Sequence, residues 1–499
     1  MVSVLSILSI NLFTLPLLGL TLVAAYFYLT KRHNYWEVRG IPYVTPSFLF
    51  GSLVDVFTGK LQIAEYLGSL HAKFKGPYFG MYMMGTPQLI VRSPALIKDI
   101  LIRDFNVFDN RSFSSDQNAD PISANSLITV KNPRWKALRS KVLPIYSTGK
   151  LKLMFQLMFK SANDLEQHLE EHNNESIDIR EVSAKYMTDL IATCAFGFEA
   201  NSFAKVESDI RKFSRTMLDF TMGKLFCFLS HLFFPKLVTL FNLRFLDTRA
   251  LEKVFVSTMA HREETKIKRN DFIDLLLKVR DEKDDLVLFD TNTMLAQALT
   301  FFIAGVESIS NLVSFVLYNL CLKEEYQERL QKEIQEAIKT HADLNFENIN
   351  TLKFLDMVVN ETLRKYPFGL FLNRVCNRDY TVKETGFVIE KGTPIIISID
   401  GIHKDPEIYE SPEEFRPERF ENGNKSFSQN CTFIPFGTGP RSCIGIRFAL
   451  MAAKLAIVMV LRKFKVEKSA DTPMDIVIKP FSPFMTPKNG LSMRIRKLE

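Results

Sequence analysis

The sequence lacks several features that would assign it to a common non-enzymatic class. Its six cysteines include no Cys-x-x-Cys pair and no closely spaced set, which argues against a disulfide scaffold and indicates reduced thiols. No internal repeat or low-complexity tract occurs beyond residue 50. The net charge of +7 comes from interspersed residues and not from a basic tail, so nucleic-acid binding receives little support. An anionic membrane surface or an acidic protein partner fits this charge at least as well.

Charged side chains are also absent from residues 1–30, which are rich in Leu, Ile, Val and Phe. About 20 apolar residues span a bilayer core, whereas the apolar region of a cleaved signal peptide usually has about 7–15. Lys31, Arg32 and His33 follow the run, and positive charge at this end favours a cytoplasmic position for the body. We therefore expect a membrane anchor at 1–30, a basic stop and proline-rich linker at 31–51, and a catalytic domain at 52–499. Cleavage of a signal peptide is the alternative.

The body of the chain has the hydrophobic pattern of a mainly helical protein with a minor β subdomain. Residues 78–92 predict a hairpin that turns at 85–87, and the β-branched run at 392–400 predicts a strand. Residues 403–440, rich in Pro, Gly, Asn and Glu, predict coil. The apolar segment 220–245 is interpreted either as buried core or as an element that dips into a membrane surface. Helical periodicity is clearest at 150–172, 178–196, 205–222, 250–280, 290–321 and 323–339.

One cysteine lies in a sequence context that points to chemistry. Residues 436–445 read Phe-Gly-Thr-Gly-Pro-Arg-Ser-Cys-Ile-Gly and open an apolar helical run. The first two glycines of this segment allow a tight turn and a close approach of backbone amides to a bulky ligand. Cys443 lies at the helix start, where unpaired N–H groups and the helix dipole favour a thiolate. Gly445 leaves room for a flat macrocycle, and Arg441 can pair with a carboxylate of that macrocycle. A buried structural role is the usual fate of a lone cysteine, and the other five cysteines are interpreted in that way.

The pattern Phe-x-x-Gly-x-Arg-x-Cys-x-Gly resembles the haem-binding loop of the cytochromes P450, and every position of it is met here. Residues 191–197 and 269–277 resemble the insect microsomal members that oxidise foreign compounds. Four further motifs of that family occur in the expected order along the body. They are Trp135–Arg139, Ala304–Ser308, Glu361–Arg364 and Pro417–Phe420.

The resemblance implies the cytochrome P450 fold and a role for each matched residue. Cys443 would be the axial ligand of haem b, and Glu361 and Arg364 would form a buried network with Arg419 that holds the coil before the haem loop. Haem contacts are implied for Trp135, Arg139, Arg374, Phe436, Gly437, Arg441, Cys443 and Gly445.

Two residues of the predicted helix 290–321 are implied to assist oxygen chemistry. Ser308 would hydrogen-bond dioxygen at the haem, and Glu307 would help to deliver protons. The commoner residue at position 308 in the family is Thr, so the methyl group that restrains the rotamer is missing here. Gly305 is unfavourable in a helix interior by roughly 1 kcal/mol relative to Ala. It suggests either a local distortion that opens a groove for oxygen and water or close packing against a neighbour.

The family likeness also implies a reaction, partners and a location. We expect a monooxygenase at the cytoplasmic side of the endoplasmic reticulum membrane, which inserts one atom of O₂ into a lipophilic small molecule. Electrons would come from NADPH through a flavoprotein reductase, with a cytochrome b-type protein as a further donor. Core packing is the alternative role for each candidate of the substrate pocket. These candidates are Phe105, Phe108, Phe301, Phe302, Ala304, Leu370, Phe371 and Phe484.

Three rival interpretations remain at this stage. A haem-thiolate isomerase or lyase would use the same fold without oxygen, although it would not need the Glu307–Ser308 pair. A haem sensor or carrier would have no turnover. Finally, residues 168–172 read His-Leu-Glu-Glu-His, a zinc-protease pattern, but a solvated helix end is the better interpretation because no third ligand is evident nearby.

Overall fold

The computed structural model describes residues 17–499 apart from 18, 22, 24–25, 28–29, 207, 219–220, 245–247, 270, 282–288 and 342–344. The expected anchor at 1–30 lies mostly outside the described residues. Within them, the one straight helix that is long and apolar enough to cross a membrane is α15 (Thr291–Leu322), and most of it is buried inside the protein. Its length and hydropathy therefore reflect a core position.

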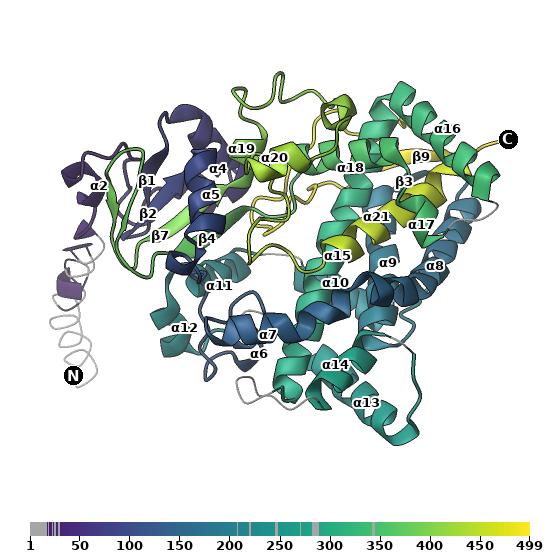
Figure 1. The fold of residues 1–499 in the computed structure, drawn as a ribbon, viewed down its shortest axis with the longest axis horizontal. Coiled ribbons are helices and arrows are strands. Elements are labelled where there is room, and N and C mark those ends of the chain that lie inside the picture. The colour runs from purple at the N-terminus through teal and green to yellow at the C-terminus, as the bar shows by residue number, and fades with distance from the viewer. Residues whose placement is uncertain are drawn as a thin grey trace, which may run out of the picture.

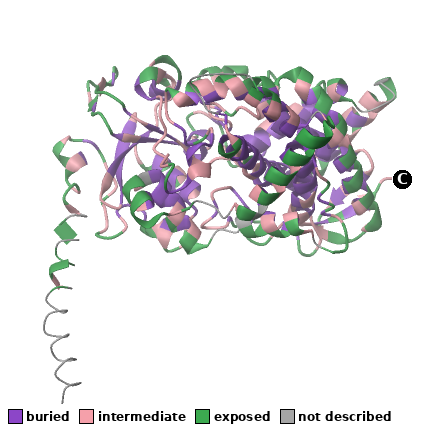
Figure 2. Ribbon diagram, turned by 90° about the horizontal axis from the view of Figure 1, so that it is seen from below, coloured by how far each residue is buried: buried purple, intermediate pink, exposed green. Residues whose placement is uncertain are grey.

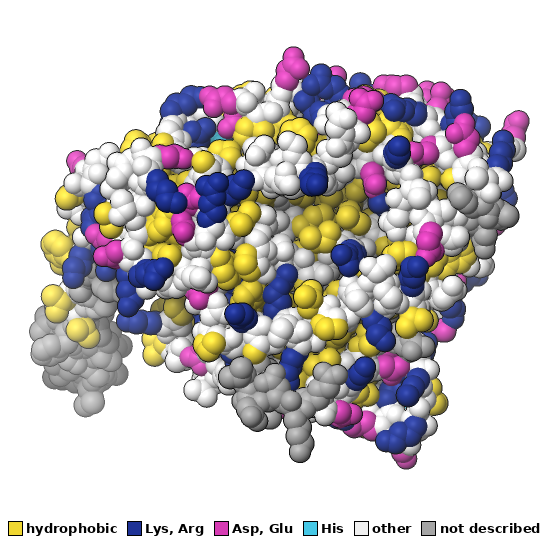
Figure 3. Space-filling view, viewed as in Figure 1, with side chains coloured by type: hydrophobic (Ala, Val, Ile, Leu, Met, Phe, Trp, Pro, Cys, Tyr) yellow, Lys and Arg dark blue, Asp and Glu magenta, His cyan; other side chains and the backbone are white. Residues whose placement is uncertain are grey.

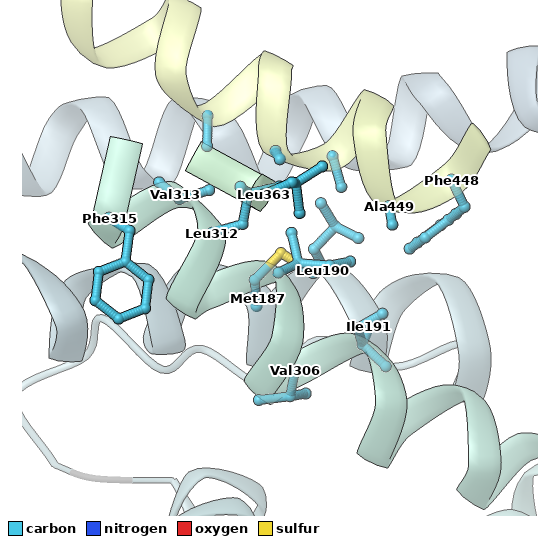
Figure 4. Packing of buried hydrophobic residues seen from close by; sticks show 14 of the residues in the cluster. Met187, Leu190, Ile191, Val306, Leu312, Val313, Phe315, Leu363, Phe448 and Ala449 are labelled. Carbon is cyan, nitrogen blue, oxygen red and sulfur yellow. The ribbon is translucent and has the colours of Figure 1, made fainter. Parts of the chain in front are cut away.

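Helix α15 is the central element of a large helical region (Figure 1). It begins where the Asp290 carboxylate accepts a hydrogen bond of 2.8 Å from the Thr293 N–H group. Helices α9 (Ile179–Ile191), α18 (Lys353–Lys365) and α21 (Ile446–Leu461) pack around it. Figure 4 shows the apolar side chains of these helices meeting in one cluster. A helix that is apolar on nearly all sides is stable in this position because every side is covered.

The remaining helices surround this centre, and buried residues run continuously through it (Figure 2). The longer ones are α4 (Ile63–Lys73), α7 (Arg134–Val142), α8 (Thr148–Glu171), α10 (Asp209–Leu218), α11 (Met222–Phe233), α12 (Pro235–Phe241), α13 (Arg249–Thr265), α14 (Phe272–Asp281) and α16 (Glu324–His341). The short ones are α2 (Tyr35–Val38), α3 (Val54–Phe57), α5 (Pro94–Lys98), α6 (Pro121–Ala124), α17 (Phe346–Ile349), α19 (Ile399–His403) and α20 (Lys425–Gln429).

Three small sheets complete the described fold. The largest has the order β1-β2-β7-β4, formed by β1 (Tyr78–Met83), β2 (Thr86–Val91), β7 (Pro394–Ser398) and β4 (Phe371–Val375). Its pairs are antiparallel except for β2 with β7, which is parallel. A second sheet has the order β3-β9-β8, with β3 (Ser176–Asp178), β9 (Ser492–Lys497) and β8 (Phe464–Glu467). The third pairs β5 (Tyr380–Thr381) with β6 (Val388–Ile389).

The expected class, mainly helical with a minor β part, is confirmed. The predicted hairpin is present as β1 and β2, although the chain turns at Met84 and Gly85, and Pro87 already belongs to β2. The predicted helix 250–280 is wrong as a single element, because α13 ends at Thr265 and the next residue, Lys266, has a φ of +57°. The guanidinium of Arg262, in the last turn of α13, forms ion pairs with Asp271 and Asp274, which follow the break. Each pair has an N–O distance of 2.6 Å.

Candidate functional site

The segment before α21 forms a tight loop around Cys443. The Cys443 N–H group donates to the Phe436 carbonyl at 2.9 Å. Gly437 and Gly439 have φ values of +68° and +73°, which residues with side chains rarely adopt. A Cβ atom on Gly439 would lie 2.0 Å from the carbonyl oxygen of Leu101, so this position requires glycine. The loop thus has the tight geometry expected from its sequence.

The Cys443 thiol is free and accessible, two residues before the Gly445 N-cap of α21. Although its surface is accessible, the thiol is closely surrounded by protein atoms, and the resulting desolvation of the charged form raises its pKa. A hydrogen bond from the Gly445 backbone and the positive charges of Arg139 and Arg111 lower the pKa by less. The backbone at the helix start therefore favours the thiolate, as expected, but burial outweighs this effect in the unligated chain. Binding to a metal ion would deprotonate it.

Two of the expected haem-contacting residues, Trp135 and Arg441, are stacked beside this loop. The Arg441 guanidinium lies 4.1 Å above the Trp135 ring centroid, and Arg139 lies at 5.8 Å from the same ring. Arg441 Nε donates to the Asp109 carbonyl at 2.6 Å. Trp135 and Arg139 come from α7, so α7 and the cysteine loop form one cluster.

Arg374 and Arg441 are both buried and both hold an unsatisfied donor. Arg374 Nε and Arg441 Nη1 have no hydrogen-bond partner among the residues that the structure describes. Burial, followed by the charge of neighbouring Arg111, lowers the pKa of Arg441 to about 9. The same causes, with Arg441 as a further neighbour, lower the pKa of Arg374 well below its usual value. Buried cations with unused donors are matched by carboxylates, so these residues fit the two propionates of a haem.

Two more cations in this cluster were missed by the sequence interpretation, because neither belongs to a motif. Burial lowers the pKa of Arg111 to about 10 and that of Lys131 to about 8. Arg111 Nη2 donates to the Arg441 carbonyl at 3.3 Å. Lys131 Nζ donates to the Arg111 carbonyl and, at 2.6 Å, to the Phe113 carbonyl. Lys131 thus ties down the segment that carries Arg111.

On α15, the hydroxyl of Ser308 donates to the carbonyl of Ala304 one turn earlier. Ala304 itself is exposed, although its neighbours in the helix are mostly buried. The distortion considered for Gly305 is not seen, since α15 is continuous through this position. A Cβ atom on Gly305 would lie 2.7 Å from Cδ1 of Ile191. Gly305 therefore permits close packing of α15 against α9.

The Glu307 side chain is buried and points to neighbours other than Ser308. Its Oε1 atom accepts hydrogen bonds from Arg180 of α9 and, at 3.0 Å, from the Thr486 hydroxyl. Arg180 and Thr486 are functional candidates that the sequence interpretation missed, since neither is part of a motif.

The residues expected to form a buried network do lie together. Glu361 accepts two hydrogen bonds of 2.8 Å from Arg364, and both side chains are completely buried. Arg419 Nε lies 3.4 Å from Glu361, whose Oε1 also accepts the Arg416 N–H group at 2.9 Å. Arg364 donates in addition to the His403 carbonyl at 3.0 Å. The network thus joins α18 to the coil that leads to the cysteine loop.

A small, largely apolar pocket lies beside Ser308. One of its walls, Phe368, contacts Phe436 of the cysteine loop with ring centroids 5.1 Å apart. Figure 3 shows apolar side chains in a hollow near the middle of the face on which α21 lies. The pocket is lined by Ser308, Asn311, Leu312, Phe315, Tyr366, Pro367, Phe368, Phe484 and Met485.

Phe484 is the one expected substrate-pocket residue that lines this pocket. Phe108, Phe301 and Phe302 are buried against other aromatic rings, as core packing would place them. The remaining candidates lie elsewhere around the site. Phe105 packs 5.9 Å from the Trp135 ring, Leu370 is buried in the core, and Phe371 begins β4.

The zinc-protease pattern lies at the end of α8. The ligand atoms of His168, Glu171 and His172 come within 4.8 Å of one another. This approach follows from their spacing on the last helical turn. His172 Nδ1 donates to the His168 carbonyl at 2.8 Å, and the Glu171 side chain is exposed, as in a solvated helix end.

A free cysteine at a helix start, backed by buried cations with unused donors, fits the class of haem-thiolate proteins. Residues 41–494 match the family model described as Cytochrome P450. The chain is 35% identical to Cytochrome P450 6k1 of Blattella germanica, covering 97% of each chain. It is 34% identical to Probable cytochrome P450 6a23 of Drosophila melanogaster, covering 97% of this chain and 99% of the relative. The chain therefore belongs to the cytochrome P450 family, a family of haem-dependent monooxygenases, and the likeness to insect members is confirmed.

Proposed function

We propose that this protein is a reductase-coupled monooxygenase that oxidises lipophilic small molecules, foreign or endogenous. The observation that carries this proposal is the joint position of Cys443 and the buried cations Arg374 and Arg441, which suits a haem with two carboxylates. The overall reaction consumes RH, O₂, NADPH and one proton, and yields ROH, water and NADP⁺. The side chains around Ser308 are mostly apolar, which favours a lipophilic compound at this place.

When bound, haem with a thiolate ligand supplies the electron-rich iron that favours O–O cleavage. The residues of the chain hold it and control access and protons. Trp135, Arg139, Arg374 and Arg441 would bind its propionates, with Arg111 as an additional cation. The Ser308 hydroxyl would orient a proton toward oxygen, and the Glu307 carboxyl would supply it. Phe484 and its apolar neighbours would keep bulk water away from the substrate.

Membrane attachment at the cytoplasmic side of the endoplasmic reticulum belongs to the proposal. Apolar side chains such as Leu20 and Phe27 are exposed in the described part of the N-terminal segment, and the basic residues 31–32 follow it. Helices α11 and α12 expose further apolar residues, including Leu240 and Phe241, although α11 also buries several side chains in the core. The segment that contains α11 and α12 is thus partly buried core and partly exposed apolar surface. The exposed part supports contact with a membrane surface.

The proposed electron donor is an NADPH-dependent flavoprotein reductase, with a cytochrome b-type protein as a second donor. Lys136 of α7 and Arg447 of α21 are exposed near the cysteine loop. Figure 3 shows Lys and Arg side chains distributed over this face. Positive groups around the haem ligand favour an acidic docking surface on the donor.

The carbon monoxide difference spectrum of the reduced protein tests the proposal. A haem-thiolate protein gives a strongly red-shifted band, which Cys443→Ser should abolish and Cys321→Ser, at a buried cysteine remote from the loop, should retain. NADPH consumption with reductase and a panel of alkoxycoumarins then distinguishes a monooxygenase from an isomerase, lyase or sensor. A wild-type protein without the red-shifted band, or one that never consumes NADPH, would contradict the proposal.

A further inference from the structure

The C-terminal end of α8 brings two imidazole rings and a carboxylate together. His168 and His172 are four residues apart and share one face of the helix end, where their ring centroids lie 4.2 Å apart. The ligand atoms of His168, Glu171 and His172 all come within 4.8 Å of one another. Two imidazole nitrogens and one carboxylate oxygen are a ligand set that suits Zn²⁺, with water at the fourth position of a tetrahedral ion.

The His172 ring already has the second contact that orients a metal ligand. Its Nδ1 atom donates to the His168 carbonyl at 2.8 Å, which leaves Nε2 without a proton when the ring is neutral. Metal-binding histidines commonly donate their other ring N–H to a backbone carbonyl, because this bond fixes the tautomer and the direction of the ring. The chain alone therefore holds His172 in a form that can bind a cation.

The other two side chains of the cluster are also held by neighbours. The His168 ring packs against the Phe203 ring with centroids 4.9 Å apart, and Phe203 in turn packs against the core. Gln167 Nε2 donates to Glu171 Oε1 at 3.1 Å. Burial, followed by the charge of His172, lowers the pKa of His168 to about 4. The His168 ring is thus in the neutral form that binds metal ions.

The position of the cluster adds an electrostatic contribution. It lies at the C-terminal end of a 24-residue helix, where the helix dipole attracts cations. The Glu171 carboxylate adds a negative charge. Lys185 of α9 opposes these effects, since its charge disfavours a further positive charge at His168. A cation therefore gains from the dipole and from Glu171, and loses part of this gain to Lys185.

Small side-chain rotations are enough to complete the site. Bonds of about 2.0–2.2 Å place the ligand atoms of a tetrahedral Zn²⁺ about 3.3–3.6 Å apart. The ligand atoms of the cluster, which lie within 4.8 Å of one another, thus need to approach by little more than about 1 Å. The exposed Glu171 side chain can rotate by this amount while the two rings keep their contacts.

We propose that His168, Glu171 and His172 form a surface site for Zn²⁺. The exposed position suits an ion that exchanges with solvent, not the catalytic ion of a protease, and Glu171 serves as a ligand and not as a general base. The bound ion fastens the end of α8. The segment that follows is joined to β9, since the Asn174 N–H group donates to the Ile495 carbonyl at 2.7 Å. Because Zn²⁺ binds the folded chain, it stabilises this corner of the fold.

Calorimetric titration of ZnCl₂ into the holoenzyme, prepared without a polyhistidine tag, tests the site. We expect one Zn²⁺ per chain. His172→Asn should weaken binding at least tenfold, because the loss of a residue that only orients a ligand already costs about 10–100-fold. Glu171→Gln should also weaken binding, since the charge is removed. His261→Asn is the matched control, because His261 is an exposed histidine of α13 outside the cluster. Circular dichroism verifies that each variant is folded.

X-ray absorption at the zinc edge gives a second readout, which the haem iron does not disturb. The wild type should show two imidazoles at about 2.0–2.1 Å from Zn²⁺, and His172→Asn loaded with excess Zn²⁺ should show only one.

Four results would overturn the inference. They are a wild type that binds no Zn²⁺, an unchanged dissociation constant in His172→Asn or in Glu171→Gln, an equal loss of affinity in His261→Asn, and a zinc spectrum without two imidazoles. Weak binding that is the same in every variant would show an adventitious ion only. None of these outcomes depends on monooxygenase activity, so the inference and the proposed function can fail separately.

Discussion

Removing the Glu361 carboxylate should cost the protein both its fold and its haem. In Glu361→Ala, the completely buried Arg364 guanidinium loses a bidentate partner at 2.8 Å, and Arg419 loses its only described carboxylate contact. Breaking a buried pair in this way costs about 3–5 kcal/mol. The Arg416 N–H group, which loses its acceptor, adds about 1–3 kcal/mol. Since domains are stable by only about 5–15 kcal/mol, the sum is a large part of the total.

The assay compares the free energy of unfolding with the haem content per chain. The matched control is Arg329→Ala, which removes an exposed pair with Glu418 at 2.8 Å and should cost about 0–1 kcal/mol. Glu361→Gln retains the shape but removes the charge, and should be intermediate between the wild type and Glu361→Ala. A stable Glu361→Ala protein with full haem would refute the reasoning, because it would mean that the coil before Cys443 does not depend on this network.

Three further predictions concern single side chains. Ser308→Ala should raise peroxide release per NADPH while the carbon monoxide spectrum is retained, and unchanged coupling would count against a role for the hydroxyl. Arg374→Met should speed the transfer of haem to apomyoglobin at least tenfold without lowering the thermal midpoint of the haem-free chain, since the variant removes a buried, uncompensated charge. His403 Nε2 accepts the Ile434 N–H group at 2.9 Å, and burial lowers its pKa to about 3. Below pH 6.5 His403 is protonated in the unfolded state but stays neutral in the folded state, which stabilises the unfolded state. Lowering the pH from 7 to 5 should therefore reduce the free energy of unfolding by about 2 kcal/mol through this residue. His403→Gln should reduce that loss in denaturant titrations.

Local patterns in the sequence predicted the helices and the cysteine loop well. Helix α21 begins directly after the cysteine loop, at Ile446, as the apolar run that follows this loop predicts. Gly439 could be assigned to a tight turn from its local sequence, but its close approach to the Leu101 carbonyl could not be predicted in this way. Helices α13 and α14 could not be separated in this way, since the break depends on Arg262 meeting two carboxylates.

Sequence patterns could not predict contacts between segments that are distant along the chain. Arg180 and Thr486 lie 127 and 179 residues from Glu307, and no motif contains either of them. Gly305 illustrates the same limit, because the choice between a distortion and close packing depended on where Ile191 lies. Among the aromatic candidates for the pocket, the sequence could not distinguish Phe484 from Phe302, since both are apolar and differ only in their neighbours.

The electrostatics of the site link cofactor retention to folding. Burial raises the pKa of the Cys443 thiol and lowers those of Arg374, Arg441 and Lys131, so each of these groups is unfavourable in its charged form in the chain alone. A bound haem would offset both effects, because Cys443 would be held as a thiolate by the iron and Arg374 and Arg441 would be paired with its carboxylates. Arg374 and Arg441, whose charges are unfavourable in the unligated fold, are thus the residues that we propose to hold the ligand. Since they are buried, added salt should screen this attraction only weakly, whereas substitution of a single cation should weaken it strongly.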